Sequence, residues 1–363
     1  MKKIFLLLIV IVLCATCLFA CNDTVADTTN STVTTETPNS TKLPDTTSST
    51  SSTCTSNNSN VTDTVPITTE AYANVDALLS NNKITSITKD NYAMLSSIDL
   101  SQLPESIASV YREILEDIIT YHVLYTVDGC TVSAFVSMPK DYQTKDYPLV
   151  ICNRGGNGNF SALNAEAVAI YTQAMHCIII ASNYRETTPG TGFDEFGGKD
   201  VNDVVFWIDM VPKLEFVAQD SVYMIGESRG GMQTCLALLR DNNHVIKAAA
   251  CVSGVFDIMD LYNSRTDMQE MLARRIGGTP EECPEEYQKR SAINFADQFT
   301  TPLLIIHSTG DAKVPYAQAE EFVEALKSNE KKVEFITRED NYHSITSSDE
   351  LVNIFEQLKA IAK

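Results

Sequence analysis

One serine stands where an enzyme would place a nucleophile. Residues 226–231 read Gly-Glu-Ser-Arg-Gly-Gly and fit the pattern G-x-S-x-G, with Ser228 at the centre. The motif follows an apolar run at 222–225 and precedes a helical stretch, so the serine falls on a sharp strand-to-helix turn. Glycines on both sides leave room for that turn. The pattern and its context predict that Ser228 is a nucleophile for acyl transfer, with a glycine-rich turn as the alternative.

A serine hydroxyl attacks a carbonyl only when a base removes its proton, and an acid must orient that base. Asp311 follows an apolar run at 302–306, and His343 follows another at 332–336. The order Ser, Asp, His, with each later member placed after a later strand, is that of one class of serine hydrolases. We therefore predict that Asp311 orients His343, and that His343 is the base.

Alternatives exist for both roles. Asp257 and Asp260 follow an apolar run at 246–252, where some hydrolases carry the acid, but the Gly-Asp turn at 310–311 favours Asp311. Of the five histidines, only His343 stands in the required place. His307 precedes the Asp311 loop and is expected to form local hydrogen bonds.

The negative oxygen that forms during acyl transfer needs two hydrogen-bond donors. The first is expected to be the backbone N–H of Arg229, because it follows the nucleophile at the start of a helix. The second should come from the loop at 153–158, which reads Asn-Arg-Gly-Gly-Asn-Gly. Glycines in this loop let its backbone approach the substrate carbonyl.

Alternating apolar runs and helical stretches supply the framework for these residues. The runs are short and nearly continuous, as in strands buried on both faces of a sheet; they lie at 148–152, 177–181, 222–225, 246–252, 302–306 and 332–336. The helical stretches between and after them lie at 162–175, 201–210, 232–240, 316–326 and 351–361. This alternation predicts an α/β fold with a doubly wound, mostly parallel sheet.

Three further segments complete the expected fold. Residues 74–120 have apolar positions at helical spacing and predict an N-terminal helical extension. Residues 121–127 and 131–138 alternate around Asp128-Gly129 and predict an antiparallel β-hairpin that opens the sheet. Residues 257–297 are charged and helical, and predict a small cap or excursion.

From about residue 121 to the C-terminus, the chain resembles the catalytic domain of the prolyl oligopeptidase (S9) family, a branch of the α/β-hydrolase superfamily. The resemblance depends on the Ser228 motif, on the segment Pro302–His307 with Asp311, Val314 and Pro315, and on His343. Segments 183–185 (Asn-Tyr-Arg) and 287–291 (Tyr-Gln-Lys-Arg-Ser) are also similar, as are Gly192, 196–198 (Phe-Gly-Gly), Asp200 and Asp203.

The resemblance implies an α/β-hydrolase fold and a serine peptidase that works through an acyl-enzyme on small peptides. Two departures keep other substrates open. Arg154 stands where the family's peptidases often place a tyrosine that donates to the oxyanion, so by this resemblance the second donor is either the backbone N–H of Gly155 or the guanidinium of Arg154. Only about fifty ordered residues are expected before the hairpin, too few for the β-propeller of those peptidases. A carboxylesterase acting on small or carbohydrate esters is therefore an alternative, and a catalytically silent binding lipoprotein is another.

The N-terminus predicts export. Residues 1–20 combine two lysines with an apolar run and small residues, as in a signal peptide. The segment 18–21 (Leu-Phe-Ala-Cys) resembles a lipoprotein box, which would make Cys21 the site of lipidation. In residues 21–70 about half of the side chains are Ser or Thr, so this segment is expected to be a disordered tether. The folded catalytic domain is then 71–363, outside the cytoplasm at the cell membrane, or secreted if Cys21 is not lipidated.

Composition narrows the possible partners. The formal net charge of −20 offers no basic stripe for phosphates and argues against nucleic acid. The ten cysteines show neither a CxxC pair nor metal-ligand spacing with His. Cys152, Cys177 and Cys251 lie in apolar runs and are expected to be small core residues. We therefore expect no metal and no cofactor, and contact with the membrane only through the lipid.

Overall fold

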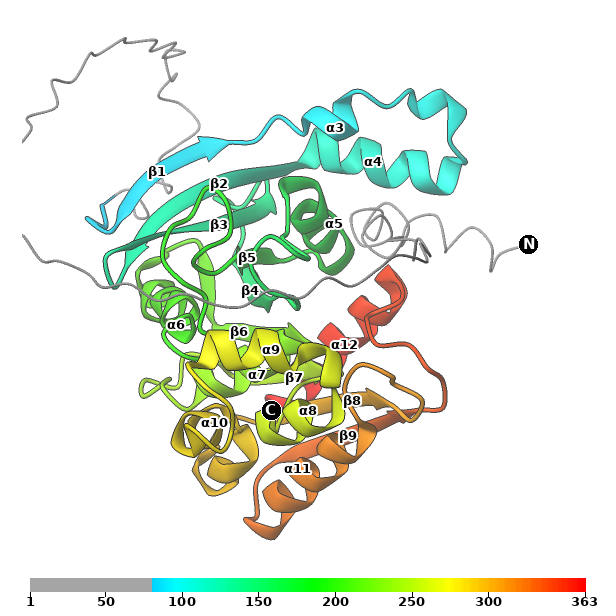
Figure 1. Cartoon of the computed structure of the whole chain (residues 1–363). Coiled ribbons are helices and arrows are strands. Elements are labelled where there is room, and N and C mark those ends of the chain that lie inside the picture. Colours follow the sequence, from blue (N-terminus) through cyan, green and yellow to red (C-terminus); the bar gives the residue numbers. More distant parts are fainter. Residues whose placement is uncertain (1–79) are drawn as a thin grey trace, which may run out of the picture.

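The computed structural model describes residues 80–363, so the expected signal peptide, tether and Cys21 lie outside the described residues. Within them, nine strands form one mixed sheet in the order β1-β2-β3-β5-β4-β6-β7-β8-β9 (Figure 1). The strands are β1 (Ile84–Lys89), β2 (Ile118–Val127), β3 (Cys130–Pro139), β4 (Tyr147–Asn153), β5 (Ile178–Ser182), β6 (Val217–Glu227), β7 (Ala248–Val252), β8 (Leu303–Ser308) and β9 (Val333–Arg338).

The pairing directions match the predicted sheet. Strands β2 and β3 form the antiparallel hairpin around Asp128 and Gly129, and β3 joins β5 antiparallel. From β5 through β4, β6, β7 and β8 to β9, every pair is parallel. Parallel strands place their carboxyl ends at one edge of the sheet, and the loops at this edge are where ligands bind in such folds.

Helices cover both faces of the sheet because successive side chains of a strand point in opposite directions. Side chains of β4 such as Val150 and Cys152 pack with α5 (Ala165–Met175) and α12 (Ser348–Ile361). Leu149 and Ile151, on the opposite face, share a core with α6 (Val201–Met210), α7 (Arg229–Leu238) and α11 (Tyr316–Ser328). Cys152, Cys177 and Cys251 are buried in this framework, as predicted.

The predicted helical extension at 74–120 lies within the described residues from residue 80 onward, and there the prediction is wrong in part. Helices α3 (Ala93–Ser96) and α4 (Glu105–Asp117) do form, but residues 84–89 are strand β1. Four of its six residues are Ile or Thr, which are β-branched and favour strands. Ile84 and Ile87 pack against the core while β1 pairs antiparallel with β2 at the edge of the sheet.

The predicted excursion between β7 and β8 is helical. It contains α8 (Ile258–Ser264), α9 (Gln269–Ile276) and α10 (Pro284–Arg290), with 3-10 turns at Thr266–Met268 and Ala292–Gln298. We call residues 258–290 the cap. Within the described part of the chain, no helix combines the length and the apolarity needed to cross a membrane.

Candidate active site

Ser228 lies on a strained turn between β6 and α7. Its φ of 56° and ψ of −124° are rare for a residue with a side chain, and such strain is concentrated at functional sites. Helix α7 begins at Arg229, three residues earlier than predicted, and passes so close to β4 that a Cβ on Gly230 would collide with the carbonyl oxygen of Asn153. The turn therefore presents a partly exposed Ser228 at the carboxyl edge of the sheet.

Asp311 and His343 are in direct contact at the same edge. His343 Nδ1 lies 2.7 Å from Asp311 Oδ2, while Oδ1 accepts the backbone N–H groups of Lys313 at 2.8 Å and Val314 at 3.2 Å. The Asp311 side chain is fully buried and that of His343 is 12% exposed. Burial acts to raise the pKa of Asp311, but the histidines beside it and the N–H groups hold it well below its usual range. An ionised Asp311 thus fixes the orientation of the imidazole.

The loop that carries His343 is attached to the residue before the nucleophile. Glu227 Oε2 accepts the backbone N–H of Ile345 at 3.0 Å. Arg338, at the end of β9, donates to the carbonyl of Tyr342 at 2.9 Å. These bonds hold the loop before α12 to the ends of β6 and β9. Ser228, Asp311 and His343 therefore lie at the same carboxyl edge of the sheet.

The alternative acids have other partners. Asp257 caps α8 by accepting the N–H of Met259 at 2.8 Å, and Ser291 Oγ donates to it at 2.9 Å. Asp260 accepts Gln318 Nε2 at 2.8 Å. The carboxylates of Asp257 and Asp260 therefore bind α8, Ser291 and Gln318 and not His343.

His307 forms local contacts, as expected, but one of them is with the acid itself. Its Nε2 lies 3.0 Å from the carbonyl oxygen of Val314 and 3.3 Å from Asp311 Oδ2. The imidazole is fully buried beneath the Asp311 loop. Sequence reasoning placed His307 near this loop but gave it no part in holding the carboxylate.

Gly155 lies against the nucleophile. A Cβ built on Gly155 would stand 3.2 Å from Ser228 Cβ and 3.7 Å from Ser228 Oγ. The backbone N–H of Arg229 belongs to the first turn of α7, where N–H groups have no acceptor within the helix. Both backbone candidates for the oxyanion therefore lie beside Ser228.

The guanidinium alternative at Arg154 is wrong, because its N–H groups are already engaged. The side chain is buried and donates to the oxyanion loop (residues 154–163) and to the segment after β5, at distances from 2.7 to 3.2 Å. Its acceptors are the carbonyls of Gly155, Gly158, Phe160 and Asn183 and the hydroxyl of Thr187. Burial lowers the pKa of Arg154 to about 10, so the group stays charged at neutral pH. Arg154 holds the loop instead of facing the substrate.

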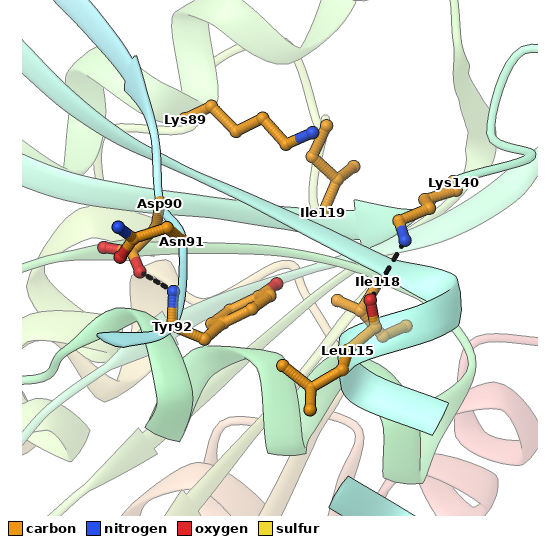
Figure 2. Close-up of a pocket in the computed structure, with 8 residues that line it drawn as sticks. All are labelled: Lys89, Asp90, Asn91, Tyr92, Leu115, Ile118, Ile119 and Lys140. Carbon is orange, nitrogen blue, oxygen red and sulfur yellow. Dashed lines mark hydrogen bonds between the residues drawn. The ribbon is translucent and has the colours of Figure 1, made fainter. Parts of the chain in front are cut away.

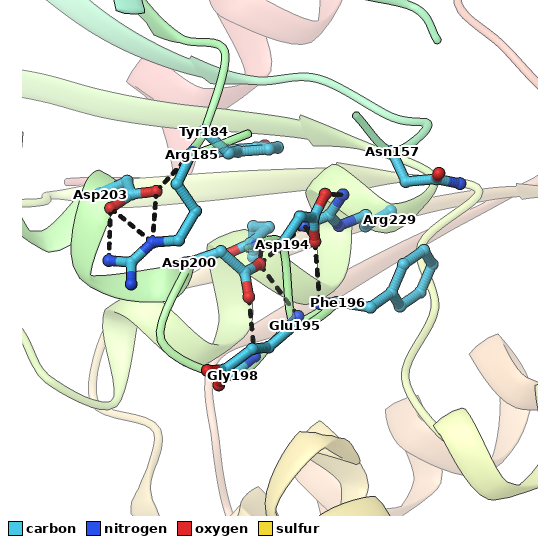
Figure 3. A network of polar contacts seen from close by, with 12 residues as sticks. Asn157, Tyr184, Arg185, Asp194, Glu195, Phe196, Gly198, Asp200, Asp203 and Arg229 are labelled. Carbon is cyan, nitrogen blue, oxygen red and sulfur yellow. Dashed lines mark hydrogen bonds and ion pairs between the residues drawn. The ribbon is translucent and has the colours of Figure 1, made fainter. Parts of the chain in front are cut away.

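The Arg229 side chain is buried in an ion-pair network that the sequence did not reveal (Figure 3). Its guanidinium pairs with both carboxylate oxygens of Asp194 at 2.6 Å and with Asp200 at 2.7 Å, and donates to the carbonyl of Gly156 at 2.9 Å. Burial acts to lower the pKa of Arg229, but the two carboxylates raise it above its usual value. In the sequence, Asp200 stood out only as part of the family resemblance. The network could have been inferred from Arg229 itself, because an arginine at the buried start of a helix requires carboxylates as counter-charges.

Two cavities lie elsewhere on the described part of the molecule. One, of about 330 Å³, is lined by Lys89, Tyr92 and Leu115 among others and lies between β1, β2 and α4 (Figure 2). The other, of about 480 Å³, is lined by Asp128, Arg185 and neighbouring residues. None of the triad candidates lines either one. In the described residues, no group of His, Cys, Asp or Glu could hold a metal ion.

Comparison with known proteins finds similar peptidases. The model of the prolyl oligopeptidase family matches residues 169–361, more than half of the chain. An uncharacterized peptidase of Bacillus subtilis, YtmA, is 29% identical over 216 residues, which make up 59% of this chain and 82% of that protein. The acylamino-acid-releasing enzyme of Sus scrofa is 25% identical over 251 residues, 64% of this chain but 34% of that enzyme.

Solved structures show the same fold. A puromycin-hydrolyzing peptidase of Mycobacterium tuberculosis has a TM-score of 0.56 at 23% identity, with 67% of this chain and 39% of that one covered. For the acylaminoacyl peptidase of Pyrococcus horikoshii the TM-score is 0.56 at 18% identity, with coverage of 72% and 46%. The predicted α/β-hydrolase fold is confirmed. Apart from the Bacillus protein, the chain spans between 34% and 46% of the length of these relatives.

Proposed function

Because this chain belongs to the prolyl oligopeptidase family of serine peptidases, we propose that it is a serine peptidase whose nucleophile is Ser228. The observation that carries the proposal is the contact of 2.7 Å between Asp311 and His343, at the edge where Ser228 occupies its strained turn. An imidazole oriented by a buried carboxylate is the arrangement that activates a serine hydroxyl.

In the first half of the reaction, Ser228 Oγ attacks the scissile carbonyl and His343 Nε2 takes the hydroxyl proton. Asp311 accepts the hydrogen bond from Nδ1 and stabilises the imidazolium. The N–H groups of Arg229 and Gly155 donate to the developing oxyanion. The leaving amine receives the proton from His343 as the C–N bond breaks, which leaves an ester between Ser228 and the acyl group.

The second half reverses these roles. His343 takes a proton from a water molecule, and the resulting hydroxide attacks the acyl carbon. The bond from Ser228 Oγ to the acyl carbon then breaks, and Oγ recovers its proton from His343. The products are a carboxylic acid and the original enzyme, so no oxidant, metal or cofactor is consumed.

Peptides are the proposed substrates, because the relatives include an uncharacterized peptidase and acylamino-acid-releasing enzymes. Peptidyl arylamides and aryl esters with the same acyl group separate peptidase from esterase. Turnover of the arylamides, lost in Ser228→Ala, is the expected result. If only the esters were turned over, the proposed peptidase activity would be wrong and the alternative, a carboxylesterase, would be supported.

A fluorophosphonate probe tests the nucleophile. Wild-type protein should be labelled on Ser228, and Ser228→Ala should not be labelled. Ser253→Ala is the matched control, because Ser253 also follows a parallel strand with a positive φ, of 49°, but is fully buried. An unlabelled wild type would contradict the enzyme and favour a silent binding protein.

We also propose that the enzyme works outside the cytoplasm as a lipoprotein anchored through Cys21. The support is the sequence of residues 1–21, with its charged start, apolar run and Leu-Phe-Ala-Cys segment. In a bacterium fed with labelled palmitate, the wild-type protein should carry the label. The Cys21→Ser variant should not be labelled. Labelling that survives this change would contradict the anchor.

A further inference from the structure

Tyr184 lies beneath the candidate oxyanion site without any assigned role. It is the second residue after β5, is fully buried, and has a positive φ of 61°. Its ring packs against two guanidinium groups, at 5.1 Å from Arg154 and 5.0 Å from Arg229 (Figure 3 labels Tyr184 and Arg229). Its hydroxyl donates a hydrogen bond of 3.1 Å to the backbone carbonyl of Arg154.

That carbonyl belongs to the peptide whose N–H is on Gly155. In a planar trans peptide, the C=O and the N–H point in opposite directions. Because the Arg154 oxygen is turned inward to Tyr184, the Gly155 N–H is turned away from Tyr184. A Cβ built on Gly155 would stand 3.2 Å from Ser228 Cβ, so the Gly155 N–H lies close to the place where Ser228 would attack a carbonyl.

The surrounding loop would tolerate another orientation without this bond. The Arg154–Gly155 peptide rotates through ψ of Arg154 and φ of Gly155, and Gly155 has no side chain to restrict that rotation. Arg154 and Arg229 hold the carbonyls of Gly155 and Gly156, which belong to the next two peptides. The Arg154–Gly155 peptide is held by Tyr184.

We propose that Tyr184 is a positioning residue that aims the Gly155 N–H at the oxyanion by holding the carbonyl of Arg154. The inference rests on the proposed function of Ser228. Tyr184 itself does not touch the substrate; it acts through one peptide group.

The hydroxyl remains a donor over a wide pH range. Burial raises the pKa of Tyr184 above its usual value, although the neighbouring arginines act to lower it. The contribution of Tyr184 should therefore be the same at every pH between 6 and 9, unlike that of a group that titrates with the reaction.

The test is Tyr184→Phe, which removes the hydroxyl and keeps the ring between the two guanidinium groups. We expect kcat for a peptidyl arylamide to fall by about 10- to 100-fold, somewhat less than the loss of an oxyanion donor, with KM unchanged. The rate constant for labelling by a fluorophosphonate should fall by a similar factor. The ratio of variant to wild-type kcat should not change with pH.

Tyr287→Phe is the matched control. Tyr287 is also a buried tyrosine that donates one bond of 3.1 Å to a backbone carbonyl, that of Gly278 in the cap. Both variants should lose similar thermal stability, but only Tyr184→Phe should lose kcat. If Tyr184→Phe had wild-type kcat, or if both variants lost kcat equally, the role of Tyr184 would be overturned. The proposed function of Ser228 would still stand. A wild type that is not labelled would overturn the proposed function, and the inference with it.

Discussion

At the scale of single residues, Asp311 is where the candidate site is most firmly defined. Its buried carboxylate is in contact with His343 and His307 and accepts two backbone N–H groups. Because these contacts depress its pKa, the stability contributed by ionised Asp311 is fully present above the usual Asp pKa of about 3.9. That contribution is lost as the pH falls through the depressed pKa that Asp311 has in the folded protein. Near neutral pH, Asp311 is ionised.

Asp311→Asn should reduce kcat by about 10⁴-fold, because an amide holds the imidazole in the wrong tautomer and does not stabilise its charge. KM should change little, since the Asp311 side chain is fully buried. Steady-state kinetics on a peptidyl arylamide measures both constants.

Asp257→Asn serves as the control for that prediction. Asp257 is the alternative acid, and asparagine is an equally good helix cap, so α8 should be preserved. Wild-type kcat is expected. A large kcat loss in Asp257→Asn together with a small one in Asp311→Asn would reverse the assignment.

At the scale of elements, the oxyanion loop is irregular chain whose shape is imposed by buried side chains. Arg154 accounts for three of its carbonyls, those of Gly155, Gly158 and Phe160, and Arg229 for that of Gly156. Gly156 and Gly158 both have a positive φ, of 69° and 49°. They differ in space: a Cβ on Gly156 would collide with the carbonyl oxygen of Phe160, while one on Gly158 would meet only Arg275 Nη2, at 3.6 Å.

Gly156→Ala should therefore displace the loop and lower kcat by at least 10-fold, the scale of a misplaced oxyanion donor. Gly158→Ala introduces the same kind of backbone strain, about 1–2 kcal/mol, without the collision, and should keep kcat near that of the wild type. Kinetics and thermal unfolding of both variants make the comparison. Equal kcat in the two variants would show that the loop tolerates displacement.

At the scale of the whole molecule, buried arginines join segments that are far apart in sequence. Arg229, after the nucleophile, pairs with Asp194 in the chain after β5. Arg275, from α9 of the cap, donates to the carbonyl of Asp194 at 2.7 Å and pairs with Glu186 at 2.7 Å. The turn with Ser228, the segment 186–200 and the cap therefore form one connected unit.

Arg229→Met should lower the free energy of unfolding by about 3–5 kcal/mol, because Asp194 and Asp200 would be left buried without their partner. The control is Arg265→Met. Arg265 also lies 2.6 Å from a carboxylate, but its partner Asp267 is 64% exposed, so about 1 kcal/mol or less is expected. Urea unfolding of both variants measures the difference, and equal losses would contradict the structural role of the network.

Sequence patterns determined much of this protein because they reflect local physics. Apolar runs of strand length predicted the parallel sheet, and the glycine-flanked serine predicted the turn at Ser228. The order Ser, Asp, His, together with the Gly-Asp turn at 310–311, chose the pair Asp311 and His343 that the structure places in contact. The strand at 84–89 was mistaken for helix, since a short half-buried edge strand is specified by its pairing with β2 as much as by its own residues.

Only the tertiary structure decided what the charged and aromatic side chains around Ser228 do. Arg154 turned inward because carbonyls from two segments surround it, and Arg229 because Asp194 and Asp200 reach it from a segment about thirty residues away in sequence. Tyr184 faces the Arg154 carbonyl for the same reason. Burying such groups is favourable only where folding brings their partners to them, and those partners are distant in sequence.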